Sequence, residues 1–417
     1  MPLPDERQRL LEAARTLKMA RSAHAYVRGN TIKFYEWLAA SPRASRAPQG
    51  PPVWICGDCH LGNLGPLADG RGGLEIQIRD LDQTVIGNPA LDIIRLALSL
   101  ASATRGSDLP GVVTAQMMEA IVEGYEAALA DPDAEIIEAG TEPDAVRTVR
   151  KRALGRRWRH LARERFNDTD PEIPLGRKFW ELSAEERKDL AATLTDPLLA
   201  KTVLSLPDDN FTTRMVDAAY WMKGCSSLGL LRYAAIIAVR RNGKRERFAL
   251  LDVKEAIAPA APSAPNVSMP ADHAQRVVAG ARALSPHLGE RMIATKALGR
   301  SVVVRELMPQ DLKLEVQQFT RSEAVRAARY LAWVVGHAHA RQLDAASRHA
   351  WRQTLLDHRS ADLDAPLWLW RSVVELSGAH EAGYLEHCRS YAMSETGRPE
   401  QPSMTEIRQE PERENVA

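Results

Sequence analysis

The sequence has little cysteine and no long hydrophobic run. Its 417 residues include 4 cysteines, too few and too scattered for the disulfide framework typical of small secreted domains. No stretch approaches the roughly 20 apolar residues that a transmembrane helix needs. Residues 1–22 are charged and lack the apolar core of a secretory signal. These absences predict a cytoplasmic protein without a membrane partner.

An excess of charge of one sign is also missing. The chain has 55 basic and 54 acidic residues, for a formal net charge of +1, so global electrostatics gives no reason to expect a nucleic acid partner. The basic cluster at 147–166 is the local exception. Its pattern is typical of a solvated helix face, and a face that contacts phosphate or a partner is the alternative.

Hydrophobic periodicity and turn residues divide the chain into segments of different kinds. Helical spacing dominates at both ends, and β-formers follow position 206, with hairpin turns expected at Asn242-Gly243 and Leu298-Gly299. The predicted fold class is therefore α+β. The segments are 1–52 (helices and a loop), 53–205 (short strands with polar loops, then helices), 206–310 (a small sheet), 311–393 (helices) and 394–417 (a disordered tail).

Two polar loops each follow a short apolar strand. Asp58 and Asn63 lie in a Gly-rich loop after the apolar run 53–56, and Asp80 and Asp82 follow a second strand. Phosphoryl transfer needs a carboxylate to accept a proton, and oxygen ligands that hold Mg²⁺ against the nucleotide phosphates. Asp58 fits the base, and the other three side chains fit the ligands. Gly, Asp and Asn are also ordinary turn residues, so the loops favour this site only in combination.

A second candidate loop lies downstream, between predicted strands. Its backbone amides and hydroxyls could cover phosphates, although an ordinary hairpin turn explains it equally well. Lys254 ends a later strand, where a lysine can pair with nucleotide phosphates or remain solvated. Strand, loop, strand, hairpin and lysine in this order favour the phosphate-binding interpretation. The loop residues proposed to bind the cofactor are Gly224, Ser226, Ser227 and Gly229.

The first pair of loops resembles the catalytic centre of aminoglycoside phosphotransferases and related small-molecule kinases. GDCHLGN is similar to their H-G-D-x-H-x-x-N loop, and residues 80–92 are similar to their stretch D-W-E-x-x-x-x-G-D-P-x-x-D. The resemblance implies a catalytic base in Asp58, a loop-stabilising or site-lining role for His60, magnesium ligands in Asn63 and Asp80, and a brace for the loop in Asp92.

The downstream strands resemble the nucleotide-binding lobe of the same kinases. The strand ending in Lys254 resembles their V-A-I-K strand, and 302–308 resembles the strand before the hinge, whose backbone at Glu306 and Met308 would hydrogen-bond adenine. The elements occur in a rotated order, as in a circular permutation. The resemblance implies a two-lobed kinase-like fold, with a helix-rich C-lobe and a small antiparallel N-lobe sheet, that uses ATP and Mg²⁺.

The whole order also resembles an uncharacterised bacterial family, domain-of-unknown-function family twenty-two fifty-two, over roughly residues 5–390. Shared marks include Tyr26-Val27-Arg28-Gly29, Arg95 and the stretch 337–341. This resemblance names no substrate. The acceptor, a small hydroxyl-bearing molecule or a protein, stays open.

Two departures from the kinase pattern keep other functions open. Cys56 stands where those kinases have a histidine, and no acidic residue lies between Asp272 and Glu290 to pair with Lys254, so that Glu255, Asp272 or Glu290 would have to substitute. Both departures favour a nucleotide-binding, pseudokinase-type regulatory protein, whereas the retained carboxylates and lysine favour an enzyme. Nucleotidyl transfer on the same fold is a third alternative.

The sequence Cys56-Gly57-Asp58-Cys59 also matches C-x-x-C. A redox motif is normally followed by a helix that lowers the thiol pKa, and a structural zinc site needs a second Cys/His pair. Residues 61–66 exclude the helix, and only His60 is near. Both functions are therefore disfavoured.

Overall fold

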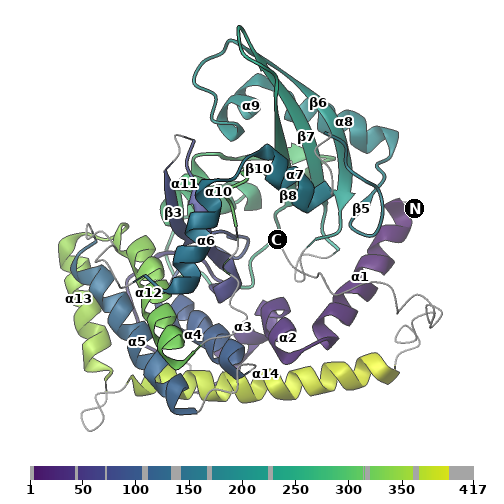
Figure 1. The fold of residues 1–417 in the computed structure, drawn as a ribbon. Coiled ribbons are helices and arrows are strands. Elements are labelled where there is room, and N and C mark those ends of the chain that lie inside the picture. Colours follow the sequence, from purple (N-terminus) through teal and green to yellow (C-terminus); the bar gives the residue numbers. More distant parts are fainter. Residues whose placement is uncertain are drawn as a thin grey trace.

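The computed structural model describes residues 4–42, 46–70, 73–105, 111–132, 142–166, 171–223, 229–312, 314, 320–359 and 366–393. It has the predicted α+β composition, with a six-stranded antiparallel sheet in one part and packed helices in the other (Figure 1). Among the helices described, none is long and apolar enough to cross a lipid bilayer. The predicted tail 394–417 lies outside the described residues.

The six-stranded sheet has the order β5-β6-β7-β8-β10-β9, and all neighbours are antiparallel. Both predicted hairpins are confirmed, because Gly243, Leu298 and Gly299 adopt left-handed backbone angles in the connections of β7 to β8 and β9 to β10. The strands are β5 (Phe179–Trp180), β6 (Phe211–Trp221), β7 (Arg232–Arg241), β8 (Arg247–Glu255), β9 (Met292–Ala297) and β10 (Arg300–Leu307).

Different helices cover the two faces of this sheet. One face packs its alternate side chains, such as Leu251 and Val253, against α8 (Ala184–Leu194) and α9 (Pro197–Val203). The opposite face packs Ile236 and Leu250 against α7 (Trp158–Phe166). The basic cluster 147–166 therefore forms α6 (Asp144–Leu154) and α7, and α7 also has a buried apolar side.

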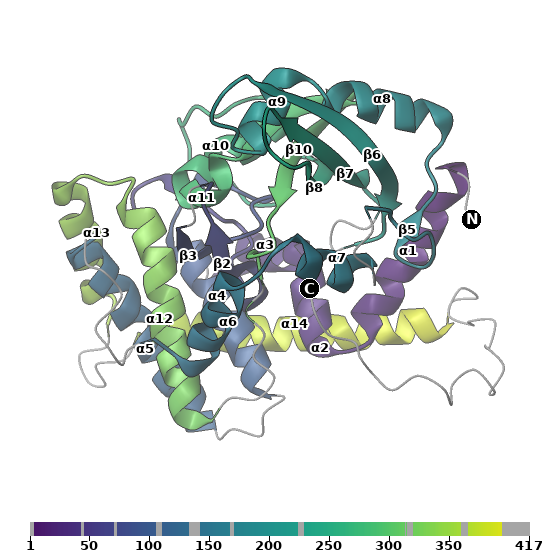
Figure 2. The ribbon, with the colours of Figure 1, turned by 45° about the horizontal axis from the view of Figure 1, so that its top comes forward.

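Two short antiparallel pairs carry the polar loops. They are β1 (Val53–Ile55) with β4 (Val85–Gly87), and β2 (Leu64–Ala68) with β3 (Leu74–Ile78). Figure 2 shows β2 and β3 between the large sheet and the helices. Strand β3 is confirmed as predicted, whereas β2 was not foreseen.

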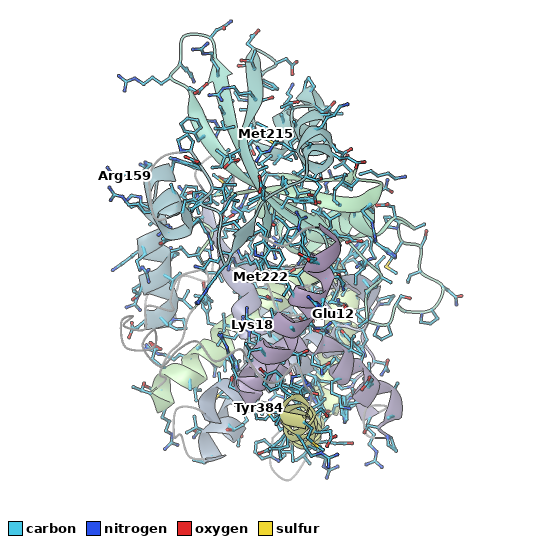
Figure 3. All side chains as sticks on the ribbon, turned by 90° about the vertical axis from the view of Figure 1, so that its right-hand side faces the viewer. Glu12, Lys18, Arg159, Met215, Met222 and Tyr384 are labelled. Atoms are coloured by element: carbon cyan, nitrogen blue, oxygen red, sulfur yellow. The ribbon has the colours of Figure 1, made fainter. Side chains whose placement is uncertain are left out.

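The first and last helices of the described chain pack together. Helix α1 (Pro4–Ala20) lies against α14 (Leu367–Met393), where Tyr384 Oη donates to the Ala20 carbonyl at 3.2 Å. Figure 3 shows Glu12 and Lys18 of α1 above Tyr384 of α14. Between them, α2 (Ala23–Gly29) and α3 (Thr31–Ala40) complete the predicted N-terminal helices.

The remaining helices form the core of the helical part. The closest pair is α5 (Gly111–Ala130) with α12 (Arg321–Ala340), and a Cβ atom on Gly124 would collide with the Arg329 carbonyl across this interface. The others are α4 (Ala90–Arg105), α10 (His273–Leu284), α11 (Pro286–Gly289) and α13 (Ala345–Asp357).

We predict that Gly124→Ala destabilises the protein by about 1–3 kcal/mol, because the added methyl group would force α5 and α12 apart. The matched control is Gly378→Ala in α14, where nothing lies within 4 Å of the added carbon. Alanine should stabilise that exposed helical position by about 0.5–1 kcal/mol. Urea unfolding measures both changes, and equal effects of the two substitutions would contradict the predicted close packing.

Candidate functional site

A single buried carboxylate shapes the loop after β1. The backbone N–H groups of Cys56 and Gly57 donate to the two oxygens of Asp92, at 2.7 and 2.9 Å. Gly57 has a φ of +74°, and a Cβ there would collide with the Gln83 carbonyl, so the turn requires glycine. Asp92 thus braces the loop as the resemblance implied.

Asp92 is itself held by a chain of buried side chains. His339 Nε2 lies 3.2 Å from Asp92 Oδ2, and His339 Nδ1 lies 2.9 Å from Tyr125 Oη. The indole of Trp351 can only donate, and it does so to Tyr125 Oη at 3.2 Å. The tyrosine hydroxyl then donates to His339 Nδ1, and His339 Nε2–H donates to Asp92. The helices α5, α12 and α13 are thereby connected to the loop.

Asp58 and Asn63 lie together at the end of this loop. Arg95 Nε donates to Asp58 Oδ1 at 2.8 Å, in an ion pair where the arginine is almost fully buried. The Asn63 amide nitrogen donates to the Asp58 carbonyl at 2.9 Å. This bond fixes the amide orientation and leaves Asn63 Oδ1 as an available acceptor.

His60 lies beside Asp58 in the same loop. Burial lowers the pKa of His60 to about 3, so the imidazole is neutral at physiological pH. It is 6% exposed, and its Nδ1 has no hydrogen-bond partner among the described residues. A buried polar atom without a partner is costly, so His60 is well suited to meet a polar group of a bound molecule.

Lys254 joins the second loop to the large sheet. Its ammonium group lies 3.5 Å from Asp80 Oδ1 and forms a second ion pair with Asp82. The lysine side chain is 11% exposed, while those of Asp80 and Asp82 are 45% and 34% exposed. The structure thus brings Lys254 together with Asp80 and Asp82, which lie 174 and 172 positions before it in the sequence.

The two aspartates titrate differently. Partial burial opposes the charged form of Asp80, but Lys254, Arg305 and Arg232 outweigh it and hold the pKa of Asp80 below its ordinary value. Burial, and then the charge of Asp80, raise the pKa of Asp82. The pKa values of the two carboxyl groups are therefore shifted in opposite directions.

None of the acids proposed from the sequence pairs with Lys254. Glu255 accepts from the Leu231 N–H and from Arg300, each at 3.0 Å. Asp272 caps α10, and for Glu290 the structure records only backbone bonds within residues 286–290. The described partners of Lys254 are Asp80 and Asp82.

A charged network surrounds Lys254 on the sheet face that also carries Asp252. Arg232 donates twice to Asp252, at 2.9 and 2.7 Å, and Arg305 reaches the same carboxylate at 3.2 Å. Burial opposes the charge of Asp252, but both arginines outweigh it and lower its pKa. Arg305 also donates to the Arg79 carbonyl at 2.8 Å, next to Asp80. Together these contacts concentrate cationic side chains around the lysine.

Helix α7 covers the apolar part of the same face. Leu161 and Phe166 pack against a cluster that includes Leu250 and Leu307. Two positions before Lys254, the ion-paired Asp252 lies on the same sheet face. The face beside Lys254 is therefore charged, whereas the part beneath α7 is apolar.

Glu306, one of the two residues proposed for the hinge, lies on the opposite sheet face from Lys254. Glu306 pairs with Leu251, whereas Lys254 pairs with Val303, so alternation puts the Glu306 and Lys254 side chains on opposite faces. The Glu306 carbonyl accepts from Arg291 at 2.6 Å, and the Met308 N–H donates to Asp311 at 3.2 Å. Both backbone groups therefore have partners within the protein.

The proposed phosphate loop is largely outside the described residues, which include neither Gly224 nor Ser226 nor Ser227. Gly229 is described, has a φ of +101°, and lies near Gln8 of α1. The cysteines of the C-x-x-C sequence are both buried, and neither forms a disulfide. A hydrogen bond to Cys59, and then burial, raise the pKa of Cys56, which disfavours a reactive thiolate.

The residues fit a magnesium ion shared with a ligand. The described chain contains no cluster of three or more His, Cys, Asp or Glu side chains that could hold a metal alone. Magnesium typically takes one or two carboxylates and completes its octahedron with phosphate oxygens and water. The partly exposed carboxylate of Asp80, with Asp82 and Asn63 Oδ1, supplies such a set.

Comparisons with known proteins give a family for the chain. The family model described as an uncharacterized protein conserved in bacteria (DUF2252) matches residues 7–390. The chain belongs to this family. No curated protein and no solved structure matches the chain. The DUF2252 match spans the candidate site, both sheets that carry its loops, and helix α12.

Several contributors to the site were not foreseen as a group. Arg232, Asp252 and Arg305 come from three adjacent strands, and His339 comes from a distant helix. The residues themselves offered one signal, since charged residues at every second position of a buried strand indicate one polar face. The family resemblance had marked Arg95 and the stretches 223–232, 252–255 and 337–341 without assigning them contacts.

We predict that His60→Gln reduces the loss of stability in acid. The pKa of His60 is about 3 in the folded protein and about 6.5 in the unfolded chain. As the pH falls from 6.5 towards 3, the unfolded chain therefore takes up a proton that the folded protein does not, and the free energy of unfolding decreases. Between pH 7 and pH 4.5 the variant should lose roughly 1–2 kcal/mol less than the wild type. Urea unfolding at both pH values measures this, with the exposed His349→Gln as control. An unchanged acid sensitivity would refute a neutral, buried His60.

Proposed function

We propose that this DUF2252 protein is an ATP- and magnesium-dependent phosphotransferase that acts on a hydroxyl-bearing acceptor. The observation that carries the proposal is the meeting of Lys254 with Asp80 and Asp82, beside the loop of Asp58 and Asn63. Phosphoryl transfer requires a cation for the phosphates, oxygen ligands for a metal and a carboxylate near the acceptor. This cluster contains all three.

The acceptor side of the proposed reaction is formed by Asp58 and His60. Arg95 holds Asp58 Oδ1, and no described donor engages Oδ2, which is the oxygen proposed to accept the proton of the acceptor hydroxyl. The unpartnered Nδ1 of His60 can hydrogen-bond the same molecule. A base and an orienting group thus lie side by side.

The donor side is formed by Lys254 and the arginines around it. An incoming phosphate group would compete with Asp80 and Asp82 for the lysine ammonium, and this would free the carboxylates for the metal. When bound, Mg²⁺ would neutralise charge on the phosphates and draw electron density from the transferred group. Arg232 and Arg305 keep the surroundings positive while they remain anchored to Asp252.

A regulatory protein that keeps the site without transferring phosphate is the second candidate. The observation that favours it concerns the sheet face that carries Lys254. There α7 and the Arg232–Asp252 ion pair occupy the surface beside the lysine. The engaged backbone groups of Glu306 and Met308 act in the same direction. Ligand binding and turnover therefore need separate tests.

We predict that ATP with Mg²⁺ raises the melting temperature of the wild type, because a ligand that binds only the folded state stabilises it. Lys254→Ala and Asp80→Ala should each remove most of this shift, since they delete the phosphate partner and the metal ligand. The control is Lys296→Ala, an exposed lysine on β9 of the same sheet. If the wild type shows no shift with ATP and Mg²⁺ under any condition, the nucleotide site is wrong.

We further predict that Asp58→Asn retains the ATP-dependent thermal shift but lowers phosphate transfer by roughly 10²–10⁴-fold, since only the proton acceptor is lost. Transfer is measured with γ-labelled ATP against a set of hydroxyl-bearing metabolites and proteins. Asp209→Asn, at an exposed aspartate far along the chain, is the matched control. Normal turnover by Asp58→Asn would disprove its role as base, and binding without any transfer by the wild type would favour the regulatory candidate.

A further inference from the structure

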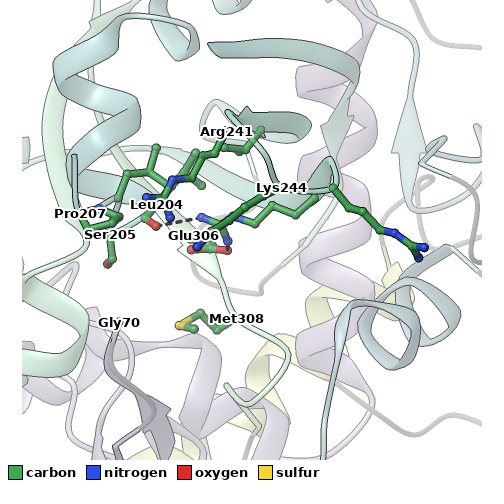
Figure 4. A pocket seen from close by; sticks show the side chains of 12 residues that line it. Gly70, Leu204, Ser205, Pro207, Arg241, Lys244, Glu306 and Met308 are labelled. Carbon is green, nitrogen blue, oxygen red and sulfur yellow. Dashed lines mark hydrogen bonds and ion pairs between the residues drawn. The ribbon is translucent and has the colours of Figure 1, made fainter. Parts of the chain in front are cut away.

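A cavity of about 350 Å³ lies at the far end of the large sheet, beneath the hairpin that joins β7 to β8. Figure 4 shows Leu204, Ser205 and Pro207 along one side of it and Arg241 and Lys244 along another. Its volume falls within the range of sites that hold small molecules. Because the Glu306 side chain lines it, the cavity opens on the sheet face opposite Lys254.

The walls of this cavity are rich in basic side chains. Four basic side chains line it, and Glu306 is the one acid among the lining residues that the structure describes. Burial raises the pKa of Glu306, and Arg247 lies 3.8 Å from its carboxyl group. The four basic residues are Arg241, Lys244, Arg245 and Arg247.

Two of the arginines are fixed in place by contacts with the protein. Arg247 donates to the Leu204 carbonyl at 3.0 Å and lies 3.8 Å from Glu306. Arg241 donates to Asp208 at 2.6 Å. Guanidinium groups held in this way lose little conformational freedom when a ligand binds, and they match the geometry of a phosphate group. Lys244 and Arg245 are exposed and can close over a bound anion.

Ser205, on one side of the cavity, has a strained backbone conformation. Ser205 adopts a φ of +48°, which is unusual for a residue other than glycine. A Cβ on Gly70, in the β2–β3 connection, would lie 2.7 Å from Ser205 Cβ, so only glycine allows this approach. The hydroxyl of Ser205 and the carboxyl of Glu306 add hydrogen-bonding groups to the cationic walls.

We propose that this cavity is a binding site for a small organic phosphate that carries hydroxyl groups, such as a sugar phosphate. The basic side chains would bind the phosphate, and Ser205 and Glu306 would hydrogen-bond the hydroxyls. Its ligand would contact both the large sheet and the β2–β3 connection. The site is separate from the cluster of Lys254 and Asp80, and it does not depend on the function proposed for that cluster.

Isothermal titration calorimetry with glucose 6-phosphate and glycerol 3-phosphate tests this site. Inorganic phosphate and glucose, which each carry only one of the two kinds of group, are the comparison ligands. At least one organic phosphate should bind with a Kd below about 1 mM and more tightly than either comparison ligand. The double variant Lys244→Glu/Arg245→Glu should weaken that binding by about tenfold or more. Both side chains are exposed, so its thermal unfolding should match the wild type.

The matched control is Arg240→Glu, because Arg240 is exposed on β7 of the same hairpin and does not line the cavity. Equal weakening by this control would show that general electrostatics is responsible and would overturn the site. Failure of both organic phosphates to bind, or binding no tighter than inorganic phosphate, would also overturn it. Lys254→Ala should leave the binding unchanged, and a loss there would place the ligand in the other cluster instead.

Discussion

The carboxylate of Asp92 is the group on which the candidate site depends. Its oxygens accept the N–H groups of Cys56 and Gly57, and the imidazole of His339 meets one of them. All of these groups are buried. A buried donor left without a partner costs about 1–3 kcal/mol, so one side chain determines the shape of the loop that carries Asp58 and also attaches it to α12.

Local chemistry explains how much of the fold could be predicted from the sequence. The hairpins at Asn242-Gly243 and Leu298-Gly299 were predicted because left-handed turn positions require particular adjacent residues. Helix α12 was predicted because its apolar spacing persists over several turns. Strand β2 was missed because Gly65 and Pro66 are poor strand formers, and its pairing with β3 overrides that local preference.

In the candidate site, too, the residues in local motifs were predictable, whereas the contacts set by tertiary packing were not. Asp58, Asn63 and Asp80 could be proposed because each lies in a short motif, and Lys254 because it ends a strand. The network of Arg232, Asp252 and Arg305 could not, since it depends on the register of three strands. The position of α7 was equally unpredictable, because an amphipathic helix does not specify which sheet face it will cover.

The packing of α1 against α14 has a consequence for how the chain is made. Leu11 of α1 is buried in the core of the large sheet, while the end of the same helix receives a hydrogen bond from Tyr384. Helix α1 can therefore complete its contacts only after α14 has been synthesised. His339 likewise lies 247 positions after Asp92, so their contact must await that much further synthesis, at roughly 5–20 residues per second. During that interval part of the helical core lacks its native contacts.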